Sequence, residues 1–169
     1  MDEEQAEPAR TRHINGAGPV GATVQQNVSL WRIRRKLSQT QLADRVTACG
    51  RRMTRQALSD IETGRRRVDV DDLVALALAL DVSPATLMMP DVRRAYTEVE
   101  LTEAPTVRPE RIAAASAWAW FTARGPAWDD RTETDVEEFQ EDAEPYWAED
   151  ARLHPETAHR GVEPGEPAV

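Results

Sequence analysis

The sequence has little of what catalytic and metal sites usually need. Its 169 residues include one cysteine, Cys49, and one lysine, Lys36. A single cysteine excludes an intrachain disulfide and a paired-cysteine zinc site, and it is typical of a reducing compartment. The chain has no His-Glu-x-x-His motif and no glycine-rich phosphate loop, and the spacing of His154 and His159 does not indicate a ligand pair. We therefore expect no catalytic residues, no metal and no cofactor.

Long apolar runs are also absent. No stretch of 18 apolar residues occurs, so no membrane span is expected. The first residues, M-D-E-E-Q-A-E-P, are acidic and lack the apolar segment of a secretory signal. These features predict a cytoplasmic protein with one domain of ordinary size and tails.

The net charge of −9 is unevenly distributed along the chain. Residues 20–96 carry 13 basic and 8 acidic side chains, a local charge of +5. Residues 126–169 carry 3 basic and 14 acidic side chains, a local charge of −11. Because exposed charges act over a Debye length of roughly 8 Å, a partner meets the local charge and not the total. We predict a disordered arm (1–19), a basic domain (20–96), a Trp-containing appendage (97–125) and an acidic, largely disordered tail (126–169).

Five helices are predicted between residues 20 and 96. In the first, from about 23 to 36, Val24, Val28 and Trp31 recur at the i, i+4, i+7 spacing of a helix face. The other four begin after capping side chains and carry apolar residues at helical spacing. The expected caps are Ser38, Thr54, either Asp69 or Asp71, and Ser83 followed by Pro84. The expected inward positions are Leu42, Ala43, Val46, Leu58, Ile61, Leu73, Leu76, Ala77, Leu80, Leu87 and Met88.

A short strand and a helix are predicted in the appendage, residues 97–125. The alternation T-E-V-E-L over 97–101 is typical of a strand, and 109–124 is predicted as a helix begun by proline and ended by Gly-Pro. Trp118 and Trp120 need burial, which we expect on the helical core, while contact across a dimer axis stays open. The predicted fold is therefore all-α, with a five-helix domain, a small strand-plus-helix appendage and a disordered acidic tail.

The helix expected between Thr54 and Gly64 turns a polar face outward. Its inward positions are Leu58 and Ile61, and its outward side chains are Arg55, Gln56, Ser59 and Asp60. Arginine can bind O6 and N7 of guanine, glutamine N6 and N7 of adenine, and serine either base. Most polar helix faces are only solvated, so this face alone does not show that the helix reads DNA bases.

Three segments in order resemble the Cro/C1-type (XRE) helix-turn-helix transcriptional regulators. They are S-Q-T-Q-L-A, R-Q-A-L-S-D-I-E-T-G and D-D-L-V-A-L-A-L-A-L-D-V-S-P, and the resemblance covers roughly residues 24–90. It implies a five-helix domain that binds double-stranded DNA, with base-reading roles for Arg55, Gln56 and Asp60. A homodimer on an inverted repeat is expected, with half-sites about 34 Å apart.

Further residues take roles from the same resemblance. Gln39 matches a position that contacts a phosphate, and Arg32 and Glu62 match an ion pair that braces the unit. One departure is the link T-A-C-G-R-R at 47–52, about five residues longer than in the family. The added residues either lengthen the second helix or form a bulge that brings Arg51 and Arg52 toward the DNA backbone. The full set of expected phosphate contacts is Ser38, Gln39, Thr40, Arg51, Arg52, Thr54, Arg65, Arg66 and Arg67.

The acidic tail leaves a second function open. Its segment V-E-E-F-Q-E-D-A-E-P-Y-W-A can form an amphipathic helix that docks a protein partner. The leading hypothesis is thus a sequence-specific transcriptional regulator of bacterial type. The alternative is an antitoxin or adaptor-type interaction module whose tail binds a protein.

Overall fold

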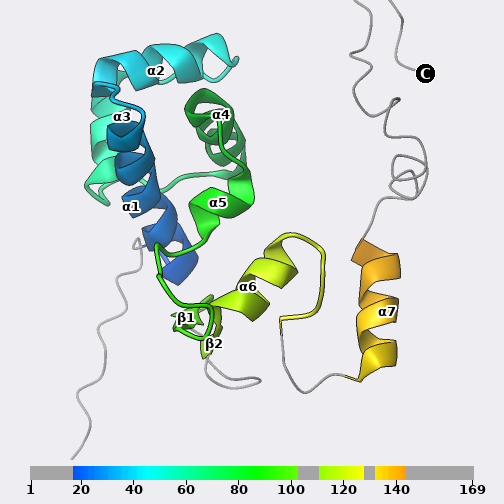
Figure 1. The fold of residues 1–169 in the computed structure, drawn as a ribbon. Coiled ribbons are helices and arrows are strands. Elements are labelled where there is room, and N and C mark those ends of the chain that lie inside the picture. Colours follow the sequence, from blue (N-terminus) through cyan, green and yellow to red (C-terminus); the bar gives the residue numbers. More distant parts are fainter. Residues whose placement is uncertain (1–16, 103–110, 128–131, 144–169) are drawn as a thin grey trace, which may run out of the picture. The chain divides into compact units, whose positions relative to one another are not determined.

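The computed structural model describes residues 17–102, 111–127 and 132–143. Within these segments the chain forms seven helices and two short strands (Figure 1). The first five helices are α1 (Pro19–Arg34), α2 (Gln39–Ala48), α3 (Arg55–Glu62), α4 (Val70–Leu80) and α5 (Pro84–Met88). They are followed by β1 (Glu98–Glu100), β2 (Arg111–Ala113), α6 (Ala114–Phe121) and α7 (Glu133–Ala143). The predicted fold class, a helical domain with a strand-plus-helix appendage, is confirmed.

By its internal contacts the chain divides into two units, residues 1–118 and 119–169. The boundary falls inside α6. None of the helices in the described segments has the length and hydrophobicity needed to cross a bilayer.

Helix α1 begins earlier than its apolar spacing indicated. Its N-cap position is Gly18 and its first residue is Pro19, whose fixed φ suits the first turn and whose missing N–H is not needed there. The prediction of a helix start near Thr23 was therefore wrong by one turn. Residues 1–16 of the expected arm lie outside the described residues.

The core of the first unit lies where α1 to α5 meet. Helix α1 contacts α3, α4 and α5, and α2 contacts α3 and α4. The predicted inward positions are confirmed: most are fully buried, and Trp31, Leu73 and Met88 pack at its margin. Each fully buried leucine or isoleucine contributes about 1.5–3 kcal/mol relative to an exposed one. The largest fully buried aliphatic side chains are Leu42, Leu58, Ile61, Leu76, Leu80, Leu87, Val28 and Val46.

Two buried amides of α1 tie this core together. Asn27 donates from Nδ2 to the carbonyl oxygens of Leu87 and Met89, at 2.9 and 2.6 Å. Gln25 donates from Nε2 to the carbonyl oxygen of Arg66 at 2.9 Å, just past α3. Because the last carbonyls of a helix have no partner within it, Asn27 satisfies the end of α5. These contacts fix α5 and the loop after α3 on α1.

Strands β1 and β2 form an antiparallel pair in which Val99 lies opposite Ile112, and both side chains are buried. Beside them Arg111 donates to Glu100 Oε1 at 2.9 Å. The prediction of a continuous helix from 109 was wrong, because residues 111–113 pair with β1 and α6 starts only at Ala114. Residues 103–110 lie outside the described residues.

The tryptophans of α6 are not buried as expected. Trp118 is 38% exposed and Trp120 is 42% exposed. The ring of Trp120 lies 5.1 Å from that of Phe121 between centroids. The expectation that both indoles pack in the core was wrong. The surrounding alanines are too small to cover two large rings on a helix of eight residues.

Residues 133–143 of the acidic segment form the helix α7. Thr132 caps it, since its Oγ1 accepts from the Asp135 backbone N–H at 3.3 Å and its own N–H donates to Asp135 Oδ2 at 2.8 Å. Val136 and Phe139 are half-buried, while the glutamates between them are exposed. This stretch of the tail, which was predicted as largely disordered, is therefore helical, and it overlaps the expected amphipathic segment over residues 136–143. Residues 128–131 and 144–169 lie outside the described residues.

Candidate nucleic-acid interface

Helix α3 is fixed at both ends by local interactions. Thr54 Oγ1 accepts a hydrogen bond from the backbone N–H of Ala57 at 3.0 Å, which satisfies one of the free donors of the first turn. At the other end Gly64 has φ +77°, a left-handed conformation that favours glycine, and its N–H donates to Ile61. Leu58 and Ile61 face the core and are fully buried. The opposite side of α3 is therefore held toward solvent.

Helix α2 begins with a capping box. Ser38 Oγ accepts from the Gln41 backbone N–H at 3.1 Å, and Gln41 Oε1 accepts from the Ser38 backbone N–H at 2.8 Å. The predicted cap is thus present, and the direction in which α2 enters the domain is set locally.

An ion pair joins α1 to the end of α3. Arg32 donates from Nε and Nη2 to the two carboxylate oxygens of Glu62, at 2.5 and 3.0 Å, and both side chains are largely buried. The hydrogen bond that Arg32 donates to Glu62 raises the pKa of the Arg32 guanidinium above its ordinary value. Gln39, the first residue of α2, donates to Glu62 at 2.9 Å. The expected pair is therefore present, and Gln39 makes it a three-residue contact between α1, α2 and α3.

The outward face of α3 carries the side chains expected to read bases. Arg55 is exposed and has no partner among the described residues. Gln56 donates to Asp60 Oδ1 at 3.0 Å, and Asp60 Oδ1 also accepts from Arg65 Nε at 3.0 Å. Asp60 thus forms a salt bridge with Arg65, three residues past the end of its own helix. Ser59 is half-buried beside them.

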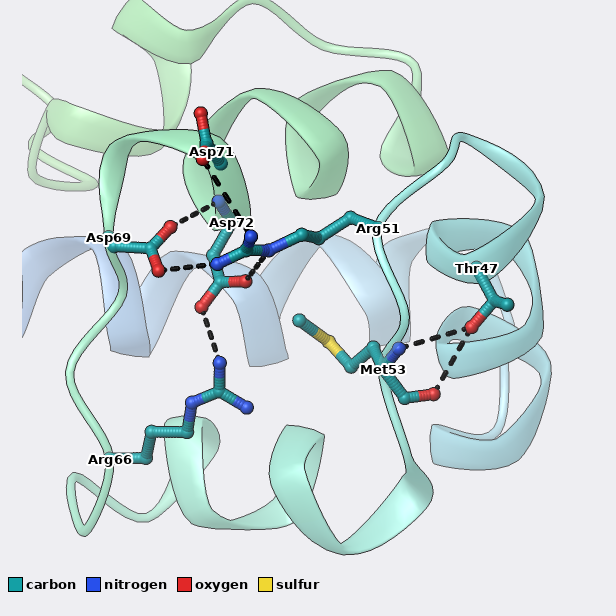
Figure 2. A network of polar contacts seen from close by, with 7 residues as sticks. All are labelled: Thr47, Arg51, Met53, Arg66, Asp69, Asp71 and Asp72. Carbon is teal, nitrogen blue, oxygen red and sulfur yellow. Dashed lines mark hydrogen bonds and ion pairs between the residues drawn. The ribbon is translucent and has the colours of Figure 1, made fainter.

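The long link before α3 is a loop. Helix α2 ends at Ala48, with the exposed Cys49 at its C-cap position. Thr47 Oγ1 accepts from the Met53 backbone N–H at 3.2 Å and lies 3.2 Å from the Met53 carbonyl (Figure 2). Met53 itself is buried in the core. The link therefore bulges between Thr47, at the end of α2, and the buried Met53.

Two arginines on either side of α3 meet one buried aspartate (Figure 2). Asp72 is 1% exposed; its Oδ1 accepts from Arg51 Nε at 2.8 Å and its Oδ2 from Arg66 Nη2 at 2.7 Å. Arg51 also donates to Asp69 Oδ2 at 2.5 Å, and Asp71 lies 3.7 Å from it. The hydrogen bond that Arg51 donates to Asp72 raises the pKa of Arg51, and the negative charges of Asp72, Asp69 and Asp71 raise it further. Both arginines were expected to contact DNA phosphates; in the structure each of them is paired with a carboxylate.

The comparison with protein families agrees with this geometry. Residues 28–87 match the family model described as helix-turn-helix. These residues are a Cro/C1-type helix-turn-helix domain. The match supports DNA binding by the domain formed by α1 to α5. Comparisons with curated proteins and with solved structures gave no match.

The remaining expected phosphate contacts lie on α2, on α3 and in the loops that flank α3. Ser38 and Thr54 are the caps of α2 and α3, where free backbone N–H groups favour an anion. Thr40 and Arg52 are exposed, and Arg65 is exposed beside Asp60. Arg67 is exposed in the loop before α4. Among the residues that the structure describes, no group of three His, Cys, Asp or Glu side chains is arranged to hold a metal ion.

Sequence reasoning missed Asp72. The run D-V-D-D was interpreted as a helix cap, and Asp69 does cap α4, since its Oδ1 accepts from the Asp72 backbone N–H at 2.7 Å. Asp72 precedes Leu76 and Leu80 by one and two helical repeats, so it shares the inward face of α4. That spacing was the available signal for a buried carboxylate.

Proposed function

We propose that this chain is a sequence-specific DNA-binding transcriptional regulator in which α3 is the recognition helix. Arg55 and Gln56 carry the proposal, because they stand exposed in the first turn of α3 within a helix-turn-helix domain. The N-terminal residues of such a helix are the ones that reach base edges in the major groove. Their side chains suit guanine and adenine. Binding, without a catalytic step, is the proposed activity.

The proposed division of labour follows from the surroundings of each side chain. Arg55, Gln56 and Ser59 read bases, and Asp60 accepts from a cytosine amino group or keeps its pair with Arg65. Phosphate contacts come from the starts of α2 and α3 and from the loops that flank α3. The proposed phosphate set is Ser38, Gln39, Thr40, Arg52, Thr54, Arg65 and Arg67. Arg51 and Arg66 are left out because Asp72 holds them.

A homodimer on an inverted repeat is the proposed binding form. Helix α4 offers a surface for a second copy: Val70, Val74 and Leu78 are 75%, 43% and 64% exposed and recur at i, i+4, i+8. In an isologous interface the same patch meets itself. Because this stripe is centred on Val74, two antiparallel α4 helices would place Val70 of one copy against Leu78 of the other. Exposed apolar stripes of this kind mark interaction surfaces.

The proposal is tested by selecting bound DNA from a random pool at a stated salt concentration, and then by comparing Arg55→Ala with Arg52→Ala. Loss of Arg55 is expected to cost about 1–3 kcal/mol at one base position and to relax selection there. Loss of Arg52 is expected to weaken all duplexes alike and to flatten the dependence of log K on log salt by about 0.9. If the two variants behave identically, or if no sequence is enriched, the assignment of base reading to α3 fails.

A second candidate is a protein-interaction module of antitoxin or adaptor type. The observation that favours it is α7, a helix whose Val136 and Phe139 share one face in a segment with a net charge of −11 over residues 126–169. An acidic amphipathic helix of this kind suits a groove on a protein partner. A pull-down with the full chain and with a chain lacking residues 126–169 separates the candidates. A partner lost with the tail supports the second function, whereas unchanged DNA selection by the shortened chain supports the first.

A further inference from the structure

Asp72 lies at the point where the two loops around α3 converge. Arg51 precedes the first residue of α3 by four positions, and Arg66 follows its last residue by four positions. Each guanidinium donates to a different oxygen of the same carboxylate, at 2.8 and 2.7 Å (Figure 2). One buried side chain of α4 is thus bound from both ends of α3.

The anchor itself is rigid. Asp72 stands in the first turn of α4, where the helix dipole favours a negative charge, and α4 is held in the core by Leu76 and Leu80. Asp69 caps the same turn and also binds Arg51. The buried carboxylate that receives the two loops is therefore placed by the packing of α4.

The cluster should persist when DNA binds. A buried carboxylate that loses its cationic partners keeps an uncompensated charge, which is strongly unfavourable. Asp72 is 1% exposed, whereas Arg51 and Arg66 are 36% and 38% exposed, so the two guanidiniums lie between the carboxylate and solvent. Because its charge is already offset by a carboxylate, a guanidinium held in this way should contribute less to neutralising a DNA phosphate.

We propose that Asp72 is a positioning residue for the recognition helix. Through Arg51 and Arg66 it fixes the loops at both ends of α3, which offsets the freedom of the long 47–52 link, and it withholds these two guanidiniums from DNA phosphates. The proposal rests on the proposed DNA-binding function of α3. It makes Asp72 a determinant of sequence discrimination although it contacts no base.

The test compares Asp72→Asn with Asp71→Asn in the full chain. The two variants remove the same charge from the same turn, but Asp71 is exposed and makes only the 3.7 Å contact with Arg51. Affinities for the selected duplex and for random-sequence duplex are measured over a series of salt concentrations. Asp72→Asn should steepen the salt slope on random DNA by roughly one to two, since each added phosphate contact contributes about 0.9. It should also lower the ratio of selected to random affinity at least tenfold, and Asp71→Asn should do neither.

If Asp72→Asn does not fold, Arg51→Gln and Arg66→Gln take its place, with Arg52→Gln as the control. The first two should leave the salt slope on random DNA unchanged, whereas Arg52→Gln should flatten it. Flattening by all three would overturn the proposal, because it would show that the two arginines contact phosphates. Equal slopes and equal affinity ratios for Asp72→Asn and Asp71→Asn would overturn it as well.

Amide hydrogen exchange separates this proposal from the proposed function. Without DNA, the amides of residues 49–54 should exchange at least tenfold faster in a folded Asp72→Asn or Arg51→Gln variant than in Asp71→Asn. If the wild-type chain enriches no DNA sequence, the proposed function fails while this measurement still decides whether the loops are held. Equal exchange in the variants and the control would overturn the positioning role.

Discussion

At the scale of single residues, Glu62 shows how far local pattern and resemblance reach. Its pairing with Arg32 was expected from the resemblance and is present, whereas its bond to Gln39 was not foreseen. Asn27, Gln25 and Asp72 were also missed as polar anchors. The bonds of Asn27 and Gln25 join segments that are distant in sequence, so they depend on which elements meet. For Asp72 the spacing to Leu76 and Leu80 indicated burial but not which arginines it would bind.

Glu62→Ala is expected to lower the free energy of unfolding by about 3–5 kcal/mol. The substitution leaves the largely buried guanidinium of Arg32 without its counter-charge and also removes the acceptor of Gln39. Urea denaturation monitored by circular dichroism measures the loss. The control is Asp91→Ala, which breaks the exposed pair of Asp91 with Arg34 and should cost less than about 1 kcal/mol. Equal losses in the two variants would show that the Arg32–Glu62 pair stabilises the domain no more than an exposed ion pair does.

At the scale of elements, the start of a helix was predicted correctly wherever a capping side chain sets it. Ser38, Thr54 and the Ser83–Pro84 pair start helices as predicted, because a cap acts within one turn. The prediction was wrong where an end depends on another segment. Residues 111–113 joined β1 as a strand because Val99 pairs with Ile112. Local propensity does not contain that partner.

Thr54→Ala is expected to destabilise the domain by about 1 kcal/mol. The substitution removes the acceptor for the Ala57 N–H at the start of α3, whose eight residues leave few internal hydrogen bonds to compensate. Thermal unfolding of the purified chain measures the effect. Thr40→Ala is the matched control, since Thr40 is exposed inside α2 and caps no helix, and its midpoint should stay close to that of the wild type.

At the scale of the whole molecule, composition indicated a basic domain and an acidic segment but not the surfaces that assemble copies. The tryptophans of α6 were expected in the core and are exposed. The inward face of α4 was predicted, but the apolar stripe of Val70, Val74 and Leu78 on its other side was not singled out, because the helix is apolar on both sides. Which apolar residues remain uncovered is a property of the assembled domain.

Val74→Glu is expected to convert the proposed dimer into a monomer. The substitution places two carboxylates against each other at the centre of the proposed α4 contact, where like charges and lost apolar burial both oppose association. Sedimentation equilibrium over a range of concentrations measures the oligomeric state. Ile33→Glu is the control, because Ile33 is an exposed apolar residue of α1 outside the stripe. A Val74→Glu protein that still sediments as a dimer would place the interface elsewhere.

The exposed thiol at the C-cap of α2 makes these questions accessible to spectroscopy. Cys49 is the sole cysteine of the chain and opens the loop that leads to α3. A maleimide-coupled spin label or fluorophore therefore attaches at one position without any engineering. Two copies so labelled would yield a single interprobe separation, a molecular ruler for the spacing of the two recognition helices before and after they engage a duplex.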